Sequence, residues 1–145
     1  MSNVIYVQGD LFKTAPKYEL LGHSVNCRGV WGNGIALQFK YKFPQAFTEY
    51  SKSCSKKENI GTVEVFGRVV CFFTSKNYGK YKDSPELIIN NTRLSIADFV
   101  IKRLEREIHI PKINSGLFGV PWKDTEQVLK EFPEITFYVY SLDNI

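Results

Sequence analysis

Short apolar stretches alternate along the chain with longer stretches whose apolar residues follow a helical spacing. The short ones contain many β-branched or aromatic side chains and end in turn residues, which is typical of buried strands. They cover residues 4–7, 20–25, 62–66, 69–74, 107–113 and 135–140. Because only Gly67 and Arg68 separate the third stretch from the fourth, these two are expected to form a hairpin. The pattern predicts about six strands.

Four stretches between these strands are expected to be helical. The first covers residues 35–43 and stops before Pro44, which begins a second helix through residue 50, because proline suits the first turn of a helix and not its interior. Ser84 and Pro85 supply an N-cap and a first turn for a third helix, and a fourth covers residues 122–132. The residues of the third helix expected to face the core are Leu87, Leu94, Ala97, Ile101 and Leu104. Strands that alternate with helices predict an α/β sandwich with a mixed sheet, parallel at the crossovers and antiparallel at the hairpin.

Size and composition predict one ordinary globular domain, residues 1–145. The chain of 145 residues is long enough for one sizeable core, its 43% hydrophobic and 23% charged residues are usual for such a domain, and no repeat or linker divides it. The net charge of +4 favours an anionic ligand but is too small for a dedicated nucleic-acid surface, so no direct nucleic-acid binding is expected. We interpret the basic cluster from Lys52 to Lys57 as a solvated loop.

Cysteine usage and hydropathy favour an intracellular location. Cys27, Cys54 and Cys71 form neither a CxxC pair nor a zinc-type spacing, and the N-terminus has no signal-peptide pattern. No apolar run approaches the roughly 20 residues that a membrane span needs. We therefore expect a soluble protein of the cytoplasm, with the nucleus as a second compartment, that binds neither a membrane nor a metal.

Two predicted strands lead into glycine-rich loops and then into helices. Residues 23–36 read HSVNCRGVWGNGIA, and residues 113–122 read INSGLFGVPW. Glycine allows close backbone approach and positive φ, and a helix N-terminus offers unpaired N–H groups, so each loop is a candidate phosphate cradle. Because the carboxyl ends of parallel strands open into one crevice, two such cradles suit a pyrophosphate.

The order of the glycines argues against two commoner nucleotide-binding motifs. Gly29 and Gly34 have the spacing of a P-loop, but Ile35 and Ala36 replace the residues that would hold terminal phosphates and Mg²⁺. The order GxxGxG also differs from the dinucleotide fingerprint, and Glu49 falls in a predicted helix instead of at a strand end. Triphosphate hydrolysis and nicotinamide-dependent redox chemistry are therefore not favoured.

Four motifs carry a resemblance to a known family: VQGDLF at residues 7–12, HSVNC at 23–27, GNGIA at 32–36 and NSGLFGVPW at 114–122. On these motifs, which span almost the whole chain, the sequence resembles the macrodomain family and, within it, the branch of fungal ADP-ribose 1″-phosphate phosphatases. The resemblance implies a three-layer α/β/α sandwich and cofactor-free hydrolysis of ADP-ribose 1″-phosphate, a by-product of tRNA splicing, to ADP-ribose and phosphate. It also implies ADP-ribosylated proteins as a second class of partner.

The same resemblance assigns roles to individual residues. Asp10, followed by Leu11, matches an acid that receives the adenine amino group, and Tyr140 matches an aromatic residue that packs on the adenine. Asn26 would contact the distal ribose, and His23 matches the histidine implicated in catalysis. The residues that would line the pyrophosphate and the distal ribose are Gly32, Asn33, Gly34, Ile35, Ser115, Gly116, Leu117, Phe118 and Gly119.

His23 also stands out without the resemblance, because a histidine titrates near neutrality and can transfer protons beside the two loops. Whether it acts as an acid/base or as a nucleophile stays open at this point. No carboxylate cluster of two-metal character is visible, so a metal-independent reaction is expected. His109 lacks such neighbours in the sequence and is interpreted as structural.

Two other macrodomain functions remain open. One class cleaves ADP-ribose from carboxylate side chains of proteins, and Lys76 matches its lysine nucleophile, but Phe118 stands where that class has a catalytic aspartate. The other is a non-catalytic reader of ADP-ribose, which shares the fold and the loops. His23 favours the enzyme over the reader.

Overall fold

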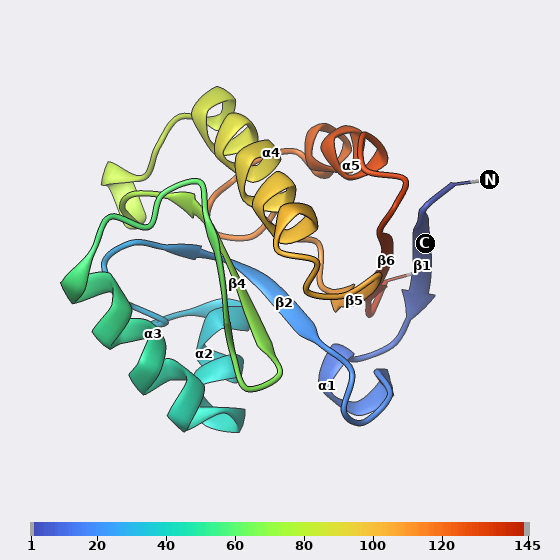
Figure 1. Ribbon diagram of the computed structural model, residues 1–145, viewed down its shortest axis with the longest axis horizontal. Coiled ribbons are helices and arrows are strands. Elements are labelled where there is room, and N and C mark those ends of the chain that lie inside the picture. Colours follow the sequence, from blue (N-terminus) through green and yellow to red (C-terminus); the bar gives the residue numbers. More distant parts are fainter. Residues whose placement is uncertain (1, 144–145) are drawn as a thin grey trace.

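The six predicted strands are present and form one sheet (Figure 1). The structure, a computed structural model, describes residues 2–143. In chain order the strands are β1 (Val4–Gln8), β2 (Leu21–Asn26), β3 (Val63–Phe66), β4 (Val69–Ser75), β5 (Glu107–Ile110) and β6 (Thr136–Ser141). The order in the sheet is β1-β6-β5-β2-β4-β3, and all neighbours are parallel except the β3–β4 hairpin. The sheet is therefore mixed, as predicted.

Helices cover both faces of the sheet, which makes three layers (Figure 1). On one face lie α1 (Leu11–Thr14), α2 (Gly34–Lys42) and α3 (Pro44–Lys56), and on the other lie α4 (Pro85–Ile101) and α5 (Trp122–Lys130). A short 3-10 helix, η1 (Gly79–Tyr81), precedes α4. None of the described helices is long and apolar enough to cross a membrane.

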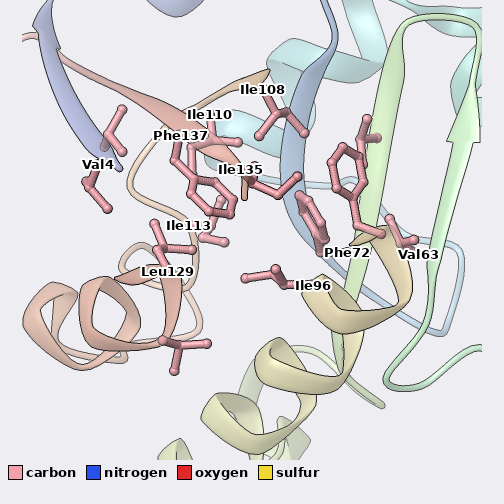
Figure 2. Close-up of a cluster of buried hydrophobic side chains, with 14 residues drawn as sticks. Val4, Val63, Phe72, Ile96, Ile108, Ile110, Ile113, Leu129, Ile135 and Phe137 are labelled. Atoms are coloured by element: carbon pink, nitrogen blue, oxygen red, sulfur yellow. The ribbon is translucent and has the colours of Figure 1, made fainter. Parts of the chain in front are cut away.

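Each face of the sheet has its own hydrophobic core. Strand β4 is buried on both faces, because its alternating side chains point in opposite directions: Phe72 packs toward α4 and α5, and Phe73 toward α2 and α3. Figure 2 shows the first of these cores, in which Ile96 of α4 and Leu129 of α5 meet the strand residues. Both layers of helices are therefore held by burial of apolar surface.

The buried face of α4 differs from the prediction. Leu87, Leu94 and Ile101 are 44%, 51% and 77% exposed, and the helix buries a neighbouring stripe: Ile88, Asn91, Thr92, Ser95, Ile96 and Phe99. The polar members of that stripe are satisfied by backbone carbonyls; Thr92, for example, donates to Ile88 at 2.7 Å. A hydrophobic pattern cannot detect a buried face whose polar side chains have tertiary partners.

Several element boundaries also differ. The helix expected to end at residue 50 continues to Lys56, so most of the basic cluster is a solvated helical turn and not a loop, because no glycine or proline interrupts it. The strand expected to reach residue 113 ends at Ile110, because Pro111 cannot donate to the sheet. The four-residue helix α1 was not predicted.

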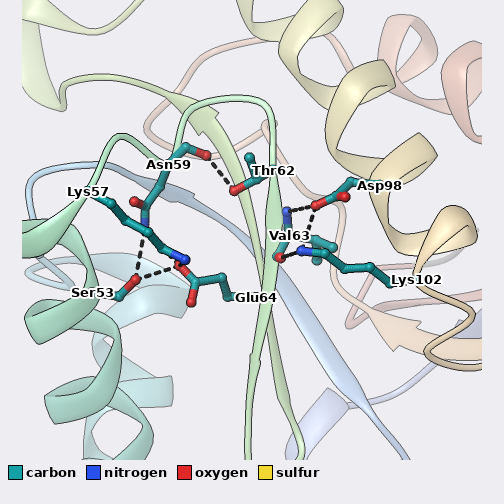
Figure 3. A network of polar contacts seen from close by, with 8 residues as sticks. All are labelled: Ser53, Lys57, Asn59, Thr62, Val63, Glu64, Asp98 and Lys102. Carbon is teal, nitrogen blue, oxygen red and sulfur yellow. Dashed lines mark hydrogen bonds and ion pairs between the residues drawn. The ribbon is translucent and has the colours of Figure 1, made fainter.

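The outer edge of β3 is covered by side chains (Figure 3). Asp98 of α4 accepts the Val63 N–H at 2.9 Å, and Lys102 donates to the Val63 carbonyl at 2.8 Å. Asp98 and Lys102 also form an ion pair with each other, at 2.9 Å. On the α3 side, Asn59 donates to Glu64 of β3 at 2.9 Å. The bonds from Asp98 and Lys102 satisfy the N–H and carbonyl of Val63, which an edge strand would otherwise expose.

Candidate active site

A cavity of about 650 Å³ opens where the carboxyl ends of β2, β4 and β5 lie side by side. Its wall is formed by loop 1 (residues 27–33, before α2), loop 2 (residues 111–121, before α5) and the β4–α4 segment (residues 76–84). Parallel neighbouring strands bring these three connections to one edge of the sheet. The predicted site residues that line the cavity are His23, Asn26, Gly32, Asn33, Gly34, Ile35, Gly116, Leu117 and Phe118.

Asn26, at the end of β2, determines the shape of loop 1. Its side-chain oxygen accepts the Arg28 N–H at 2.9 Å, and its amide donates to the Val30 carbonyl at 2.8 Å. The buried Tyr50 hydroxyl of α3 donates to the Asn26 backbone carbonyl at 2.7 Å. These bonds hold the turn that carries the chain from β2 into the glycines, so Asn26 has a structural role whether or not it also contacts a ribose.

The N-terminus of α2 faces the cavity with unpaired N–H groups. Asn33 is the N-cap, but its side chain makes no capping hydrogen bond, and the first intrahelical bond runs from Leu37 to the Asn33 carbonyl. The N–H groups of Gly34, Ile35 and Ala36 are therefore available to an anion, and the helix dipole favours one there. Gly34 has φ of +59°, a conformation that glycine adopts without strain.

Loop 2 rests on a polar network around Asn114, which is 3% exposed and has φ of +66°. Its side chain accepts from Thr74 at 2.9 Å and donates toward Thr92 at 2.9 Å and Thr125 at 3.3 Å. Its backbone N–H donates to Ser24 of β2 at 3.0 Å. The loop therefore takes its conformation from four different elements of the protein.

Loop 2 presents its free N–H groups from a turn, whereas α2 presents them from a helix N-terminus. Gly119 donates to the Gly116 carbonyl at 3.0 Å, and this bond closes a turn whose backbone N–H groups at residues 116–118 make no hydrogen bond within the described chain. Helix α5 begins only at Trp122. In loop 2 the N–H groups at the cavity therefore belong to the turn before α5, and α5 begins at the predicted residue. The role of loop 2 as a phosphate cradle stays a prediction.

His23 lies on β2 beneath loop 1 and lines the cavity although its side chain is fully buried. The imidazole stacks on Phe39, with ring centroids 3.9 Å apart, and meets Trp31 edge-on at 4.7 Å. Both ring nitrogens, like Nε1 of Trp31, are buried and have no hydrogen-bond partner among residues 2–143. Burial disfavours the charged form and lowers the pKa of His23 to about 3, so the imidazole is neutral at pH 7.

Comparison with known proteins identifies the family. The family model of the Macro domain matches residues 23–129. This chain belongs to the macrodomain family. The macrodomain is 40% identical to the ADP-ribose 1″-phosphate phosphatase of Candida albicans, over 93% of this chain and 97% of the relative. It is 33% identical to the protein of the same name in Saccharomyces cerevisiae, over 98% and 100% of the two chains.

Solved structures share the fold. The macrodomain of Mycobacterium tuberculosis DarG matches with a TM-score of 0.78 and 27% identity, over 94% of this chain and 96% of that one. Thermosipho africanus DarTG, solved in complex with ADP-ribose, matches with a TM-score of 0.81 and 22% identity, over 100% of this chain and 43% of that one. The second likeness shows the fold alone.

Three predicted ligand residues lie outside the cavity wall of this macrodomain. Asp10 is the N-cap of α1 and accepts the Phe12 N–H at 2.8 Å, and Leu11 is buried in the core. Tyr140 is 6% exposed, and its hydroxyl lies 2.7 Å from Nδ1 of His109. Their roles at the adenine stay predictions. In loop 2, Ser115 and Gly119 likewise do not line the cavity.

Several residues of the cavity wall were not predicted. They come partly from the β4–α4 segment and include Val30, Trp31, Tyr78, Gly79, Lys82 and Lys112. The available signal was the parallel β2–β4 pairing, because the connection after β4 must reach the same edge of the sheet as loop 1. Lys76 belongs to that segment but is exposed and does not line the cavity. Among residues 2–143, no group of three or more metal-ligating side chains gathers at any point.

Proposed function

We propose that this macrodomain hydrolyses ADP-ribose 1″-phosphate to ADP-ribose and phosphate. The observation that carries the proposal is a single cavity with unpaired N–H groups from α2 on one side, unpaired N–H groups from loop 2 on the other, and a histidine beneath loop 1. Two sets of oriented N–H groups suit the phosphates of an ADP-ribose chain. The names of the fungal relatives support the phosphatase activity.

The reaction needs water at phosphorus and a proton on the leaving 1″ oxygen. Attack by water forms a new P–O bond while the bond from phosphorus to the 1″ oxygen breaks. The water oxygen remains in the released phosphate, and one proton from water ends on the 1″ oxygen of ADP-ribose. In the free protein His23 is neutral and can donate or accept one hydrogen bond at each ring nitrogen. A bound phosphate dianion beside the ring would raise its pKa, which brings it toward the range useful for proton transfer.

Phosphate release from ADP-ribose 1″-phosphate, measured beside calorimetry with ADP-ribose, tests the function. His23→Ala should lower kcat by about 10²- to 10⁴-fold while ADP-ribose affinity changes little, because general acid/base groups act on the transition state. EDTA should leave the rate unchanged. Binding of ADP-ribose by a wild-type protein that releases no phosphate would instead establish a reader.

A reaction in ¹⁸O-water identifies the bond that breaks. Label in the released phosphate is expected, because it follows from attack at phosphorus. Label confined to ADP-ribose would mean cleavage at the anomeric carbon and would overturn this part of the mechanism even if His23 is essential.

Lys76→Ala should preserve phosphate release, because the side chain is exposed and outside the cavity wall. If this variant lost activity while His23→Ala kept it, the glycohydrolase class would be the better description, with ADP-ribosylated proteins as substrates. We further propose that the protein acts in the cytoplasm and nucleus, where it would clear a by-product of tRNA splicing.

A further inference from the structure

The ionisable side chains of the cavity wall are unbalanced in charge. They are His23, Tyr78, Lys82 and Lys112, and the wall contains no aspartate or glutamate. Burial keeps His23 neutral, so the two lysines supply the formal charge of the wall. A wall with two cations and no acid is complementary to an anion that carries more than one charge.

The lysines come from two different connections at this edge of the sheet. Lys82 follows β4, and Lys112 follows β5, the two strands that flank β2 in the sheet. The segment that carries Lys82 is held in place, because Asp83 accepts the Lys76 N–H at 3.0 Å and its own N–H donates to the Ser75 hydroxyl at 3.0 Å. Their positions are therefore set by the sheet and by local hydrogen bonds.

Both ammonium groups are without a partner in the part of the chain that the structure describes. Its ion pairs use other cations, namely Lys57, Arg93, Lys102 and Lys130. Lys82 and Lys112 are half-buried, and neither makes a side-chain hydrogen bond. A half-buried cation has lost part of its hydration, and an anionic ligand can replace it.

We propose that Lys82 and Lys112 form the binding site for the terminal 1″-phosphate and thereby distinguish substrate from product. The inference rests on the proposed function. The substrate carries a phosphate of nearly two negative charges at the 1″ position, whereas ADP-ribose has a neutral hydroxyl there. The N–H groups of α2 and loop 2 are then left for the pyrophosphate, which both molecules share. Hydrolysis removes the charge that the lysines hold, so ADP-ribose is released more readily than substrate.

Single and double substitutions test this division of labour. Lys82→Gln and Lys112→Gln should each lower kcat/KM for ADP-ribose 1″-phosphate by about 10- to 100-fold, as expected for a hydrogen bond to a charged group, while the Kd for ADP-ribose changes less than about twofold. Lys82→Arg and Lys112→Arg should restore most of the loss, because they keep the charge. Lys80→Gln is the matched control: it removes the same charge two residues from Lys82, and Lys80 is exposed and outside the wall.

Equal losses for substrate and for ADP-ribose would overturn the inference, because the lysines would then serve the pyrophosphate. An unchanged kcat/KM in Lys82→Gln and Lys112→Gln would also overturn it. So would an equal decrease of kcat/KM in Lys80→Gln. If the wild-type protein releases no phosphate, the proposed function fails separately. The lysine site is then tested by the ratio of Kd values for ADP-ribose 1″-phosphate and ADP-ribose, which should favour the phosphorylated ligand in the wild type and approach one in the double Gln variant.

Discussion

Loops 1 and 2 line the same cavity and are each held by the hydrogen bonds of an asparagine, but the other polar side chains packed against them differ. Beneath loop 2, Asn114 has hydrogen-bond partners for its side-chain oxygen, its side-chain amide and its backbone N–H. At loop 1, His23 beneath the loop and Trp31 within it lie in a cluster of packed aromatic rings, and among the described residues none of their three ring nitrogens has a hydrogen-bond partner. The polar groups of Asn114 at loop 2 are therefore satisfied within the protein, whereas the ring nitrogens of His23 and Trp31 at loop 1 are not.

The unpaired ring nitrogens of His23 and Trp31 lower the stability of the folded protein. A buried polar group without a partner costs roughly 1–3 kcal/mol, and a purely apolar side chain would avoid that cost. Unsatisfied buried groups are rare in folded proteins and call for an explanation. Both side chains line the cavity, and the proposed role of His23 in the reaction would account for the unpaired nitrogens of its ring.

The largest effect is expected from Asn114→Ala, which destroys the support of loop 2. The variant removes the acceptor of Thr74 and the donor to Thr92, and it places alanine at φ of +66°. The free energy of unfolding should fall by about 3–5 kcal/mol, measured by urea denaturation. Asn33→Ala in loop 1 is the control and should change it by less than about 0.5 kcal/mol, because that side chain makes no capping bond. Similar values for the two variants would contradict the comparison.

Low pH should decrease the free energy of unfolding through the buried side chain of His23. The ordinary pKa of 6.5 for His23 applies to the unfolded chain, and burial lowers the folded value to about 3. Between these pH values the unfolded chain binds a proton that the folded chain does not. The free energy of unfolding therefore decreases as the pH is lowered. The free energy of unfolding should drop by about 2 kcal/mol from pH 7 to pH 5, in addition to other groups.

His23→Phe isolates that contribution, because phenylalanine can keep the stacking on Phe39 and cannot titrate. Urea denaturation at several pH values should give a shallower pH dependence for the variant. Burial also lowers the pKa of His109, so part of the slope should remain in His23→Phe. Identical slopes for variant and wild type would show that His23 is not buried in its neutral form.

A smaller effect is expected from alanine at the first residue of α2 or at a glycine of loop 2. Gly34 of α2 has φ of +59°, whereas Gly116 of loop 2 has no positive φ, and a Cβ at either position meets nothing within 4 Å. Gly34→Ala should therefore cost about 1–2 kcal/mol through backbone strain alone, and Gly116→Ala less than about 0.5 kcal/mol. Thermal denaturation measures the difference. Equal costs would mean that crowding, and not backbone conformation, selects glycine.

The smallest effect should come from outside both loops. Asp10→Ala removes the N-cap of α1 and should cost about 1 kcal/mol of stability, whereas Asp10→Asn keeps an oxygen acceptor and should cost almost nothing. If the Asp10 carboxylate also accepts a hydrogen bond from the adenine amino group, Asp10→Ala should bind ADP-ribose more weakly in calorimetry. Its rate of phosphate release at saturating substrate should be unchanged. Unchanged affinity would reduce Asp10 to its capping role.

Much of this macrodomain could be predicted from local sequence. The alternation of apolar residues in the strands, the two-residue turn at Gly67 and Arg68, the cap at Ser84 and the glycines of both loops each act over a few neighbouring residues. Such short-range preferences are written in the chain itself, and they were sufficient for six strands, a mixed sheet and both loops.

Only the tertiary structure decided the rest, because it depends on residues far apart in the chain. The buried face of α4 was mispredicted since its polar side chains find partners on other elements, such as the Thr62 carbonyl for Ser95. Lys82 and Lys112 share a wall because β4 and β5 both lie beside β2. The sequence marks His23 as a residue whose ordinary pKa lies near neutrality. Burial in the fold lowers that pKa and keeps the imidazole neutral, because desolvation is a property of the folded environment and not of the residue.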